Sequence, residues 1–280
     1  MDSFIEMDVI DDPTELSLDP KHPGINDPSY VLRRKAFFYL ARDLRLQNLS
    51  VPVVEYTQAE HRLWSTIATK LDLLHRKHAS RIFLEGKSAL AFAAETIPQA
   101  RDLDRLLQDT TGFSLTPAEG LLAGKTYFIG WSEGKMPVTL FLRHPSHPEY
   151  TPEPDIVHDI LGHVPPLMNQ AYADLIEFIG IAAKQANPRQ MEELVRFYWF
   201  TVEYGLIRED DQIKCLGAGI LSSLAEIEHV YSGIPNVKEF NLNEVINTPF
   251  DPTRLQQLYF VSNSLAEIRD NAVKLVESWG

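Results

Sequence analysis

The sequence of 280 residues contains a single cysteine, Cys215. One cysteine excludes an internal disulfide framework and a zinc site made of several cysteines, and it is typical of a reducing cytosol. Residues 1–8 are acidic where a secretory signal would be basic, and no run approaches the roughly 18–20 apolar residues of a membrane helix. We therefore expect a soluble protein of the cytoplasm without a membrane partner.

Basic residues are scarce as well, because 26 lysines and arginines face 39 aspartates and glutamates and leave a formal net charge of −13. Such a surface repels phosphate groups, so no nucleic acid is expected as a partner. The longest basic run, Arg33-Arg34-Lys35, is expected on the solvated face of a helix. A hydrophobic content of 44% in a chain of this length allows a substantial core.

Helical periodicity dominates the sequence. Residues 1–30 combine acidic residues with prolines and show no period, which predicts an irregular N-terminal tail. Helices are expected over residues 31–49, 57–77, 88–95, 98–108, 171–186, 189–207, 218–231 and 264–279. A loop is expected at residues 111–117, followed by a hairpin of strands 125–131 and 137–143. The fold class predicted is mainly α (α+β), with residues 31–280 in a single domain.

Two histidines five residues apart, His158 and His163, precede a carboxylate forty residues further on, Glu203. Two imidazoles and one carboxylate are the protein ligands of a facial triad, which leaves open positions on a non-haem Fe(II). A catalytic zinc site can use the same three ligands. Asp155 and Asp159 are competing oxygen ligands in the same stretch. The spacing therefore predicts a metal site and leaves the metal open.

The spacing of the histidines requires a departure from a straight α-helix, in which residues five apart point about 140° away from each other. Gly162 and Pro165 are expected to end the helix just before His163, so that this side chain turns back towards His158. Glu203 is expected in a separate helix, from which it can approach the metal from another side.

The motifs around these residues resemble those of the pterin-dependent aromatic amino acid hydroxylases. They lie in the order of that family at residues 111–113, 120–122, 143–144, 150–155, 158–165, 198–206 and 217–226. The resemblance runs from about residue 109 to the C-terminus and is closest to the short bacterial type that consists of a catalytic domain alone. It implies a helical catalytic domain with a few short strands. It also implies an enzyme that uses Fe(II), tetrahydropterin and O₂ to hydroxylate the ring of an aromatic amino acid.

The resemblance also implies roles for individual residues. His158, His163 and Glu203 would bind the iron, with Tyr198 close to the metal. Arg143 would bind the α-carboxylate of the substrate, and Thr151 and Ser222 would contact the backbone of the amino acid. The substrate pocket would further include Pro154, Trp199, Glu226 and Val261, and the pterin would contact Gly120, Leu121, Leu122, Tyr127 and Asp159.

Three positions bear on substrate and cofactor preference. Asp159 stands where relatives commonly have a glutamate that reaches the pterin through water, so a side chain one methylene shorter would lengthen this contact or change the preferred pterin. Trp199 matches phenylalanine and tyrosine hydroxylases, and the apolar Val261 matches phenylalanine hydroxylases. The resemblance therefore favours conversion of phenylalanine to tyrosine by a monomer or weak oligomer. Hydroxylation at the meta carbon, tyrosine or tryptophan as substrate, a zinc hydrolase and a non-catalytic binding module remain alternatives.

Overall fold

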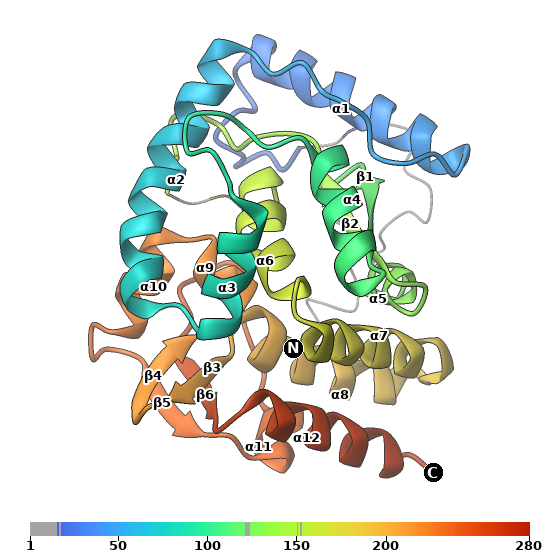
Figure 1. Cartoon of the computed structure of the whole chain (residues 1–280), viewed down its shortest axis with the longest axis vertical. Helices are drawn as coiled ribbons and strands as arrows, with labels where there is room; N and C mark the ends of the chain where they lie inside the picture. The colour runs from blue at the N-terminus through green and yellow to red at the C-terminus, as the bar shows by residue number, and fades with distance from the viewer. Residues whose placement is uncertain (1–15, 17, 121–123, 150, 152) are drawn as a thin grey trace.

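The computed structural model of the chain describes residues 16, 18–120, 124–149, 151 and 153–280. Within this part, helices surround the centre of the molecule, and a two-stranded and a four-stranded sheet lie apart from each other (Figure 1). The predicted class, mainly helical with a few short strands, is confirmed. Two of the predicted site residues, Leu121 and Leu122, lie outside the described residues.

The helical elements are α1 (Pro28–Leu46), α2 (Gln58–His78), α3 (Arg81–Leu90), α4 (Ala100–Thr111), α5 (Gly124–Trp131), the π-helical turn η1 (His158–His163), α6 (Val164–Leu167), α7 (Gln170–Gln185), α8 (Pro188–Tyr198), the π-helical turn η2 (Trp199–Glu203), α9 (Ala218–Leu221), α10 (Leu224–Val230), α11 (Leu242–Asn247) and α12 (Leu265–Glu277). The strands are β1 (Ser114–Ala118), β2 (Lys135–Thr139), β3 (Leu206–Glu209), β4 (Gln212–Cys215), β5 (Asn236–Glu239) and β6 (Leu258–Ser262).

The long predicted helices are confirmed as α1, α2, α4, α7, α8 and α12, most of them with ends shifted by a few residues. The helix predicted at residues 189–207 extends too far, because α8 is followed by the π-helical turn η2 and residues 206–207 belong to β3. The start of α2 shows the predicted capping box. The Thr57 side chain accepts a hydrogen bond from the backbone N–H of Glu60, and the Glu60 carboxylate accepts one from the N–H of Thr57. The start of α2 is therefore determined by residues that are neighbours in the sequence.

The helix predicted at residues 88–95 is wrong in position, because α3 lies earlier in the chain. Ser80 provides the N-cap, since its hydroxyl accepts a hydrogen bond from the N–H of Phe83. The helix ends where Ala91 adopts a left-handed conformation, with φ of 48°. The serine cap and the left-handed residue together place the helix one to two turns before its predicted position.

The predicted hairpin is also wrong. Residues 124–131 form the helix α5, and β2 pairs in parallel with β1, which occupies part of the predicted loop at 111–117. A short apolar run does not distinguish a strand from a buried helix. Here α5 packs against α7, and a Cβ at Gly180 of α7 would lie 2.3 Å from the backbone nitrogen of Ser132. This close backbone contact decides in favour of the helix.

The basic run in α1 differs from its prediction at Arg34, which is only 2% exposed. Its guanidinium lies 3.3 Å from the ring centroid of Phe141 and 2.5 Å from Glu153 Oε1. The buried His22, in the segment before α1, lies 3.3 Å from the same carboxylate. The N-terminal helix is therefore tied to a loop that is more than a hundred residues away in the sequence.

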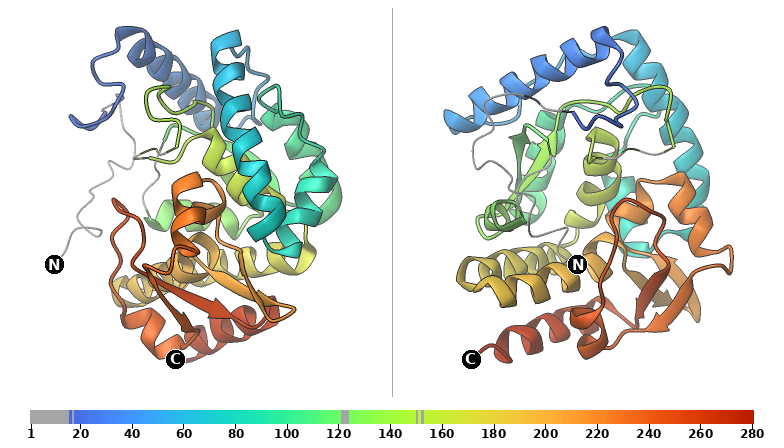
Figure 2. Two further views of the ribbon diagram at one scale, coloured as in Figure 1. Left: turned by 90° about the vertical axis from the view of Figure 1, so that its left-hand side faces the viewer. Right: turned by 180° about the vertical axis from the view of Figure 1, so that it is seen from behind.

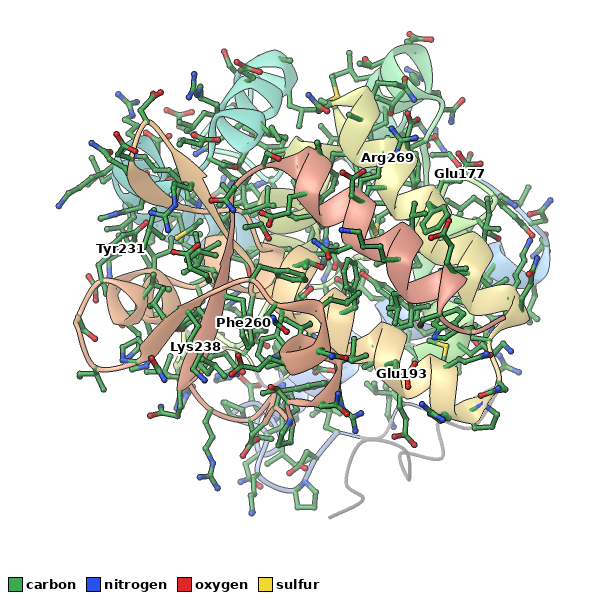
Figure 3. All side chains as sticks on the ribbon, turned by 90° about the horizontal axis from the view of Figure 1, so that it is seen from below. Glu177, Glu193, Tyr231, Lys238, Phe260 and Arg269 are labelled. Atoms are coloured by element: carbon green, nitrogen blue, oxygen red, sulfur yellow. The ribbon has the colours of Figure 1, made fainter. Side chains whose placement is uncertain are left out.

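The C-terminal part contains the four-stranded sheet, with the order β4-β3-β6-β5 (Figure 2). Strand β6 pairs in parallel with both β3 and β5. Helix α12 lies across α7 and α8 on the face shown in Figure 3, and Trp279 beyond its end donates a hydrogen bond to Glu193 of α8 at 2.9 Å. The predicted helix 218–231 is divided into α9 and α10, because Ser223 caps a new helix.

No helix among the described residues is both long and apolar enough to span a bilayer.

Candidate active site

The two histidines project from one helical turn at the centre of the molecule. Residues 156–167 form a continuous helix, and the turn from His158 to His163 is π-helical. In a π-helical turn the backbone hydrogen bonds join residues five apart, which brings their side chains to the same face. The prediction that Gly162 and Pro165 end the helix before the second histidine is therefore wrong, because the helix widens and continues.

Gly162 instead allows η1 to pack directly against α9. A Cβ on Gly162 would lie 2.8 Å from the carbonyl oxygen of Ala218, the first residue of α9. A Cβ on Gly217, which precedes α9, would lie 2.3 Å from the carbonyl oxygen of Glu203. Backbone contacts at two glycines thus hold together the segments that carry the histidines and the carboxylate.

Glu203 is the last residue of the second π-helical turn, η2, as expected in a separate helical segment. Tyr198 precedes it by five residues, and its hydroxyl donates a hydrogen bond to Glu203 Oε2 at 2.5 Å. The same five-residue spacing that aligns the histidines therefore aligns this tyrosine with the carboxylate. The hydrogen bond from Tyr198 thus orients the Glu203 carboxylate, whose two oxygens both lie near the histidines.

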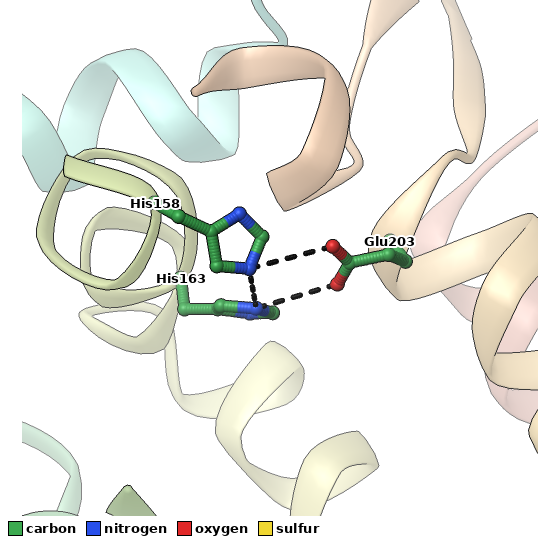
Figure 4. Close-up of side chains that lie close together, drawn as sticks. All are labelled: His158, His163 and Glu203. Carbon is green, nitrogen blue, oxygen red and sulfur yellow. Dashed lines mark hydrogen bonds and ion pairs between the residues drawn. The ribbon is translucent and has the colours of Figure 1, made fainter. Parts of the chain in front are cut away.

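The three side chains converge on one point (Figure 4). The Nε2 atoms of His158 and His163 are 3.1 Å apart, and they lie 3.4 Å and 3.3 Å from the Oε1 and Oε2 atoms of Glu203, respectively. Two donor atoms bound about 2.1 Å from one ion lie about 3.0 Å apart at a right angle and about 3.4 Å apart at a tetrahedral angle. The donor set therefore fits a single metal ion held from one side.

The charge states also suit a metal ion, which binds neutral imidazole and ionised carboxylate. Burial lowers the pKa of His158 to about 4, so this ring is neutral at pH 7. Burial alone would raise the pKa of Glu203, but His158, His163 and Tyr198 outweigh it and hold that pKa at about 2. Glu203 is therefore ionised, as a metal-binding carboxylate must be.

Ser222 holds the outer nitrogen of one histidine. Its Oγ lies 3.0 Å from Nδ1 of His158, while Nε2 of the same ring points to the other ligands. A hydrogen bond to the outer nitrogen fixes the orientation and the tautomer of a metal-binding imidazole. The resemblance of the motifs implied only a contact between Ser222 and the backbone of the substrate.

Arg143 and Asp155 form a buried, bidentate ion pair. The Nε and Nη2 groups of Arg143 donate to the two carboxylate oxygens of Asp155 at 2.9 and 2.8 Å, and Nη1 donates to the carbonyl of Pro148 at 3.3 Å. The guanidinium fork has a second pair of donors, formed by one N–H of each terminal nitrogen. Among the described residues no acceptor is recorded for that pair, so it can receive a carboxylate.

Asp159 is bound to the end of β2 and is not part of the ligand group. Its Oδ2 accepts hydrogen bonds from the backbone N–H and the hydroxyl of Thr139, both at 2.7 Å. Burial raises the pKa of Asp159 to about 7, although the Thr139 hydrogen bonds oppose this shift. Neither Asp159 nor Asp155 belongs to the three-residue group that could hold a metal, so the expectation that they compete as ligands is wrong.

A buried polar and aromatic cluster surrounds Trp199. Its ring stacks on Phe250 at a centroid distance of 4.0 Å, and its Nε1 donates to Gln256 Oε1 at 3.1 Å. The backbone N–H of Gln256 in turn donates to Glu226, which also accepts a hydrogen bond from the Tyr259 hydroxyl. The structure thus joins the predicted Trp199 and Glu226 through Gln256, which the sequence did not indicate.

Val261 lies fully buried in β6, where it pairs with Leu206 of β3 and Glu239 of β5. Leu206 follows Glu203 by three residues in the chain, so β6 runs beside the segment that carries the carboxylate. Among the described residues, no hydrogen bond or ion pair links Val261 to the three ligand side chains.

Tyr127 of α5 lies beside the ligand His163, with 3.5 Å between its hydroxyl and Nε2 of the histidine. Its ring contacts Trp131 edge-on at 4.8 Å and Tyr198 at 6.2 Å. Burial raises the pKa of Tyr127 well above its usual value, so its hydroxyl keeps its proton. This position suits an aromatic wall next to the metal.

The loop before η1 brings several predicted residues together. The Thr151 hydroxyl donates to the carbonyl oxygen of Glu153 at 2.8 Å, and Pro154 lies half-buried between Glu153 and Asp155. A Cβ on Gly120 would lie 4.0 Å from the Glu153 carboxylate. The pairing of Glu153 with α1 was not predicted, since nothing in a sequence indicates a partner so distant along the chain.

Comparison with known proteins agrees with this site. A family model described as biopterin-dependent aromatic amino acid hydroxylase matches residues 4–278. Phenylalanine-4-hydroxylase of Rattus norvegicus is 38% identical over a region that covers 90% of this chain and 56% of the rat protein. Tyrosine 3-monooxygenase of Caenorhabditis briggsae is 35% identical over a region that covers 90% of this chain and 49% of the nematode protein. Phenylalanine hydroxylase of Chromobacterium violaceum, solved with iron(III) and 7,8-dihydrobiopterin, has a TM-score of 0.75 and 32% identity over 83% of this chain and 89% of that chain.

The fold and the site together define a helical domain built around a two-histidine, one-carboxylate metal centre. The chain belongs to the biopterin-dependent aromatic amino acid hydroxylase family, and the resemblance predicted from its motifs is confirmed. The chain spans about half the length of the first curated relatives that it matches.

Proposed function

We propose that this protein is a monooxygenase that hydroxylates the ring of phenylalanine to give tyrosine, with Fe(II), a tetrahydropterin and O₂. The observation that carries the proposal is the convergence of His158, His163 and Glu203 within a chain of this family. Three protein ligands on one side of the ion leave its other positions open. Iron bound there would supply the activation of O₂ by the reduced pterin.

In this proposal the residues of the chain bind and orient the two organic molecules. The free donor pair of Arg143 receives the α-carboxylate of the amino acid in a bidentate contact, as its guanidinium geometry favours. Thr151, Pro154 and Trp199 border the amino acid, and Tyr127 and Gly120 border the pterin. The buried aromatic residues around the ligands limit the access of water to the reacting atoms.

Phenylalanine is proposed over tyrosine because of the apolar residue at position 261. A buried valine leaves a phenolic hydroxyl without a partner, and burying an unpaired hydroxyl costs about 1–3 kcal/mol. Trp199, stacked on Phe250 in a filled cluster, supports a phenyl ring over the larger indole. The monomeric or weakly associated state and the cytoplasmic location remain predictions from the sequence, and light scattering after gel filtration tests the first of them.

The test is aerobic turnover by the chain after anaerobic reconstitution with Fe(II). Phenylalanine, tyrosine and tryptophan are each supplied with tetrahydropterin, and the products are separated by chromatography. We expect tyrosine from phenylalanine, and no product from Glu203→Gln, which removes a charged ligand. Meta-tyrosine would correct the position of attack, and the absence of any hydroxylated amino acid would overturn the proposal. Pterin binding without substrate-dependent oxygen consumption would select a non-catalytic binding module.

A further inference from the structure

One buried histidine outside the ligand group has no role in the proposed chemistry. His75 lies in α2 and is fully buried. Its Nε2 is 2.7 Å from the carbonyl oxygen of Leu221, which is 146 residues away in the sequence. Its Nδ1 is 3.0 Å from Nζ of Lys87 in α3, and the same ammonium lies 2.9 Å from the carboxylate of Asp72.

These contacts fix the direction of every hydrogen bond. A lysine ammonium has donors only, so Lys87 donates to Nδ1 of His75, which must be the unprotonated nitrogen. The proton of the neutral ring is then on Nε2, which donates to the carbonyl of Leu221. Asp72 holds the ammonium from its other side. The imidazole is therefore locked in one tautomer and one orientation.

The Leu221 carbonyl lies next to a residue that contacts the metal centre. Leu221 is the last residue of α9, a single turn whose end leaves carbonyl groups without intrahelical partners. The next residue, Ser222, places its hydroxyl 3.0 Å from Nδ1 of His158. The contact from His75 thus fixes the peptide bond that immediately precedes the serine.

We propose that His75, oriented by Lys87 and Asp72, is a positioning residue that holds the end of α9 and thereby keeps the Ser222 hydroxyl on the metal ligand His158. The proposal rests on the proposed function only in taking His158 as a metal ligand. Through this path, α2 and α3 on the outside of the domain set the orientation of one imidazole at its centre.

The test uses Co(II) as a spectroscopic probe, because its visible absorption reports on ligand geometry and its affinity is measured without turnover. In the full chain we expect His75→Phe, which removes the donor, to weaken Co(II) binding about tenfold, as loss of a hydrogen bond to a metal-binding histidine does. His75→Gln, which can still donate to the Leu221 carbonyl, is expected to recover most of that affinity.

A double-mutant cycle separates positioning from general destabilisation. Ser222→Ala should weaken Co(II) binding by a similar factor, and the double variant with His75→Phe should be no worse than either single one, because both act through the same hydrogen bond. Independent, multiplying losses would overturn the proposal. If His75→Phe fails to fold, Lys87→Met is used in its place, and it is expected to shift the Co(II) spectrum.

His78→Phe is the matched control, because His78 lies one turn along the same helix and contacts Tyr231 rather than α9. It is expected to bind Co(II) like the unchanged protein. Failure of the proposed metal site is recognised separately, as the unchanged chain would then bind Co(II) no better than Glu203→Ala. Tight binding that depends on Glu203 but is unaffected in His75→Phe and Lys87→Met would overturn the positioning role alone.

Discussion

Arg143 is oriented for its proposed substrate contact by Asp155, because a buried bidentate ion pair holds the guanidinium in one plane. Replacing it with lysine keeps the positive charge but loses the fork that can serve two carboxylates at once. For Arg143→Lys we expect KM for phenylalanine to rise about 10- to 100-fold, which corresponds to the 1.5–3 kcal/mol of a charged hydrogen bond. Arg189→Lys is the control, since Arg189 forms an exposed pair within α8. An unchanged KM in Arg143→Lys would contradict the assignment.

His75 should make the protein sensitive to mild acid. Burial and, to a smaller extent, the Lys87 ammonium lower the pKa of His75 to about 3, whereas an unfolded histidine titrates near 6.5. Because the depressed pKa means that only the unfolded chain takes up a proton, the free energy of unfolding falls as the pH drops from 6.5 towards 3. Between pH 7 and pH 5 the loss is about 2 kcal/mol. Urea unfolding of the metal-free protein between pH 7 and pH 5 should show this loss, and His75→Gln should lack it. The same dependence of the free energy of unfolding on pH in both proteins would contradict the prediction.

The residues of the site differ in how far the sequence reveals them. The motifs singled out His158, His163 and Glu203, and the structure brings these three together. They gave no indication of His75, because its partner Leu221 is 146 residues away and a buried histidine has no local pattern. Contacts made through tertiary packing are not encoded in the spacing of neighbouring residues.

At the scale of elements, sequence periodicity finds the long helices and misses the π-helical turns. The capped helix α2 was predictable from Thr57 and Glu60, which act within one turn. A π-helical turn has no period of its own in a run of six residues, so His158 and His163 suggested a broken helix instead. Residues 124–131 were likewise not predictable from periodicity, because the helix that they form depends on packing against α7.

The contact between η1 and α9 leaves no room for a side chain at position 162. In Gly162→Ala the added methyl would lie 2.8 Å from the Ala218 carbonyl and would push the two segments apart. We expect a loss of about 1–3 kcal/mol in the free energy of unfolding, typical of overpacking, together with weaker Co(II) binding. Ile160→Val is the control in the same turn, with a loss of about 0.5–1.5 kcal/mol and unchanged metal affinity. Equal metal affinity in both variants would show that this backbone contact does not support the site.

At the scale of the whole molecule, helical periodicity along the sequence predicted the helical class, and the structure adds connections between distant parts. Arg34 of α1 was expected in solvent, but it is buried against Phe141 and pairs with Glu153, 119 residues away. An arginine in a basic run gives no sign of burial, because the paired carboxylate is visible only in three dimensions. The N-terminal helix therefore supports the loop that bears Thr151 and Pro154.

Breaking this connection should be costly because it leaves a cation buried without its partner. For Glu153→Gln we expect a loss of about 3–5 kcal/mol in the free energy of unfolding at pH 7, measured by urea titration. The ion pair also lowers the pKa of Glu153, since Arg34 and His22 outweigh the effect of burial. A depressed carboxyl pKa stabilises the fold above about pH 4.5 and loses this effect as the pH falls through the folded pKa. The difference between Glu153→Gln and the unchanged protein should therefore shrink below pH 4.5.

The same loop provides a matched control in Glu149, whose pair with Lys70 is about half-exposed on both sides. Glu149→Gln should cost no more than about 1 kcal/mol, because solvent screens an exposed pair. If the loop is held for substrate binding, Glu153→Gln should also raise KM for phenylalanine while Glu149→Gln leaves it unchanged. Equal effects of the two substitutions on stability and KM would mean that the buried connection between α1 and the loop contributes nothing beyond an ordinary surface ion pair.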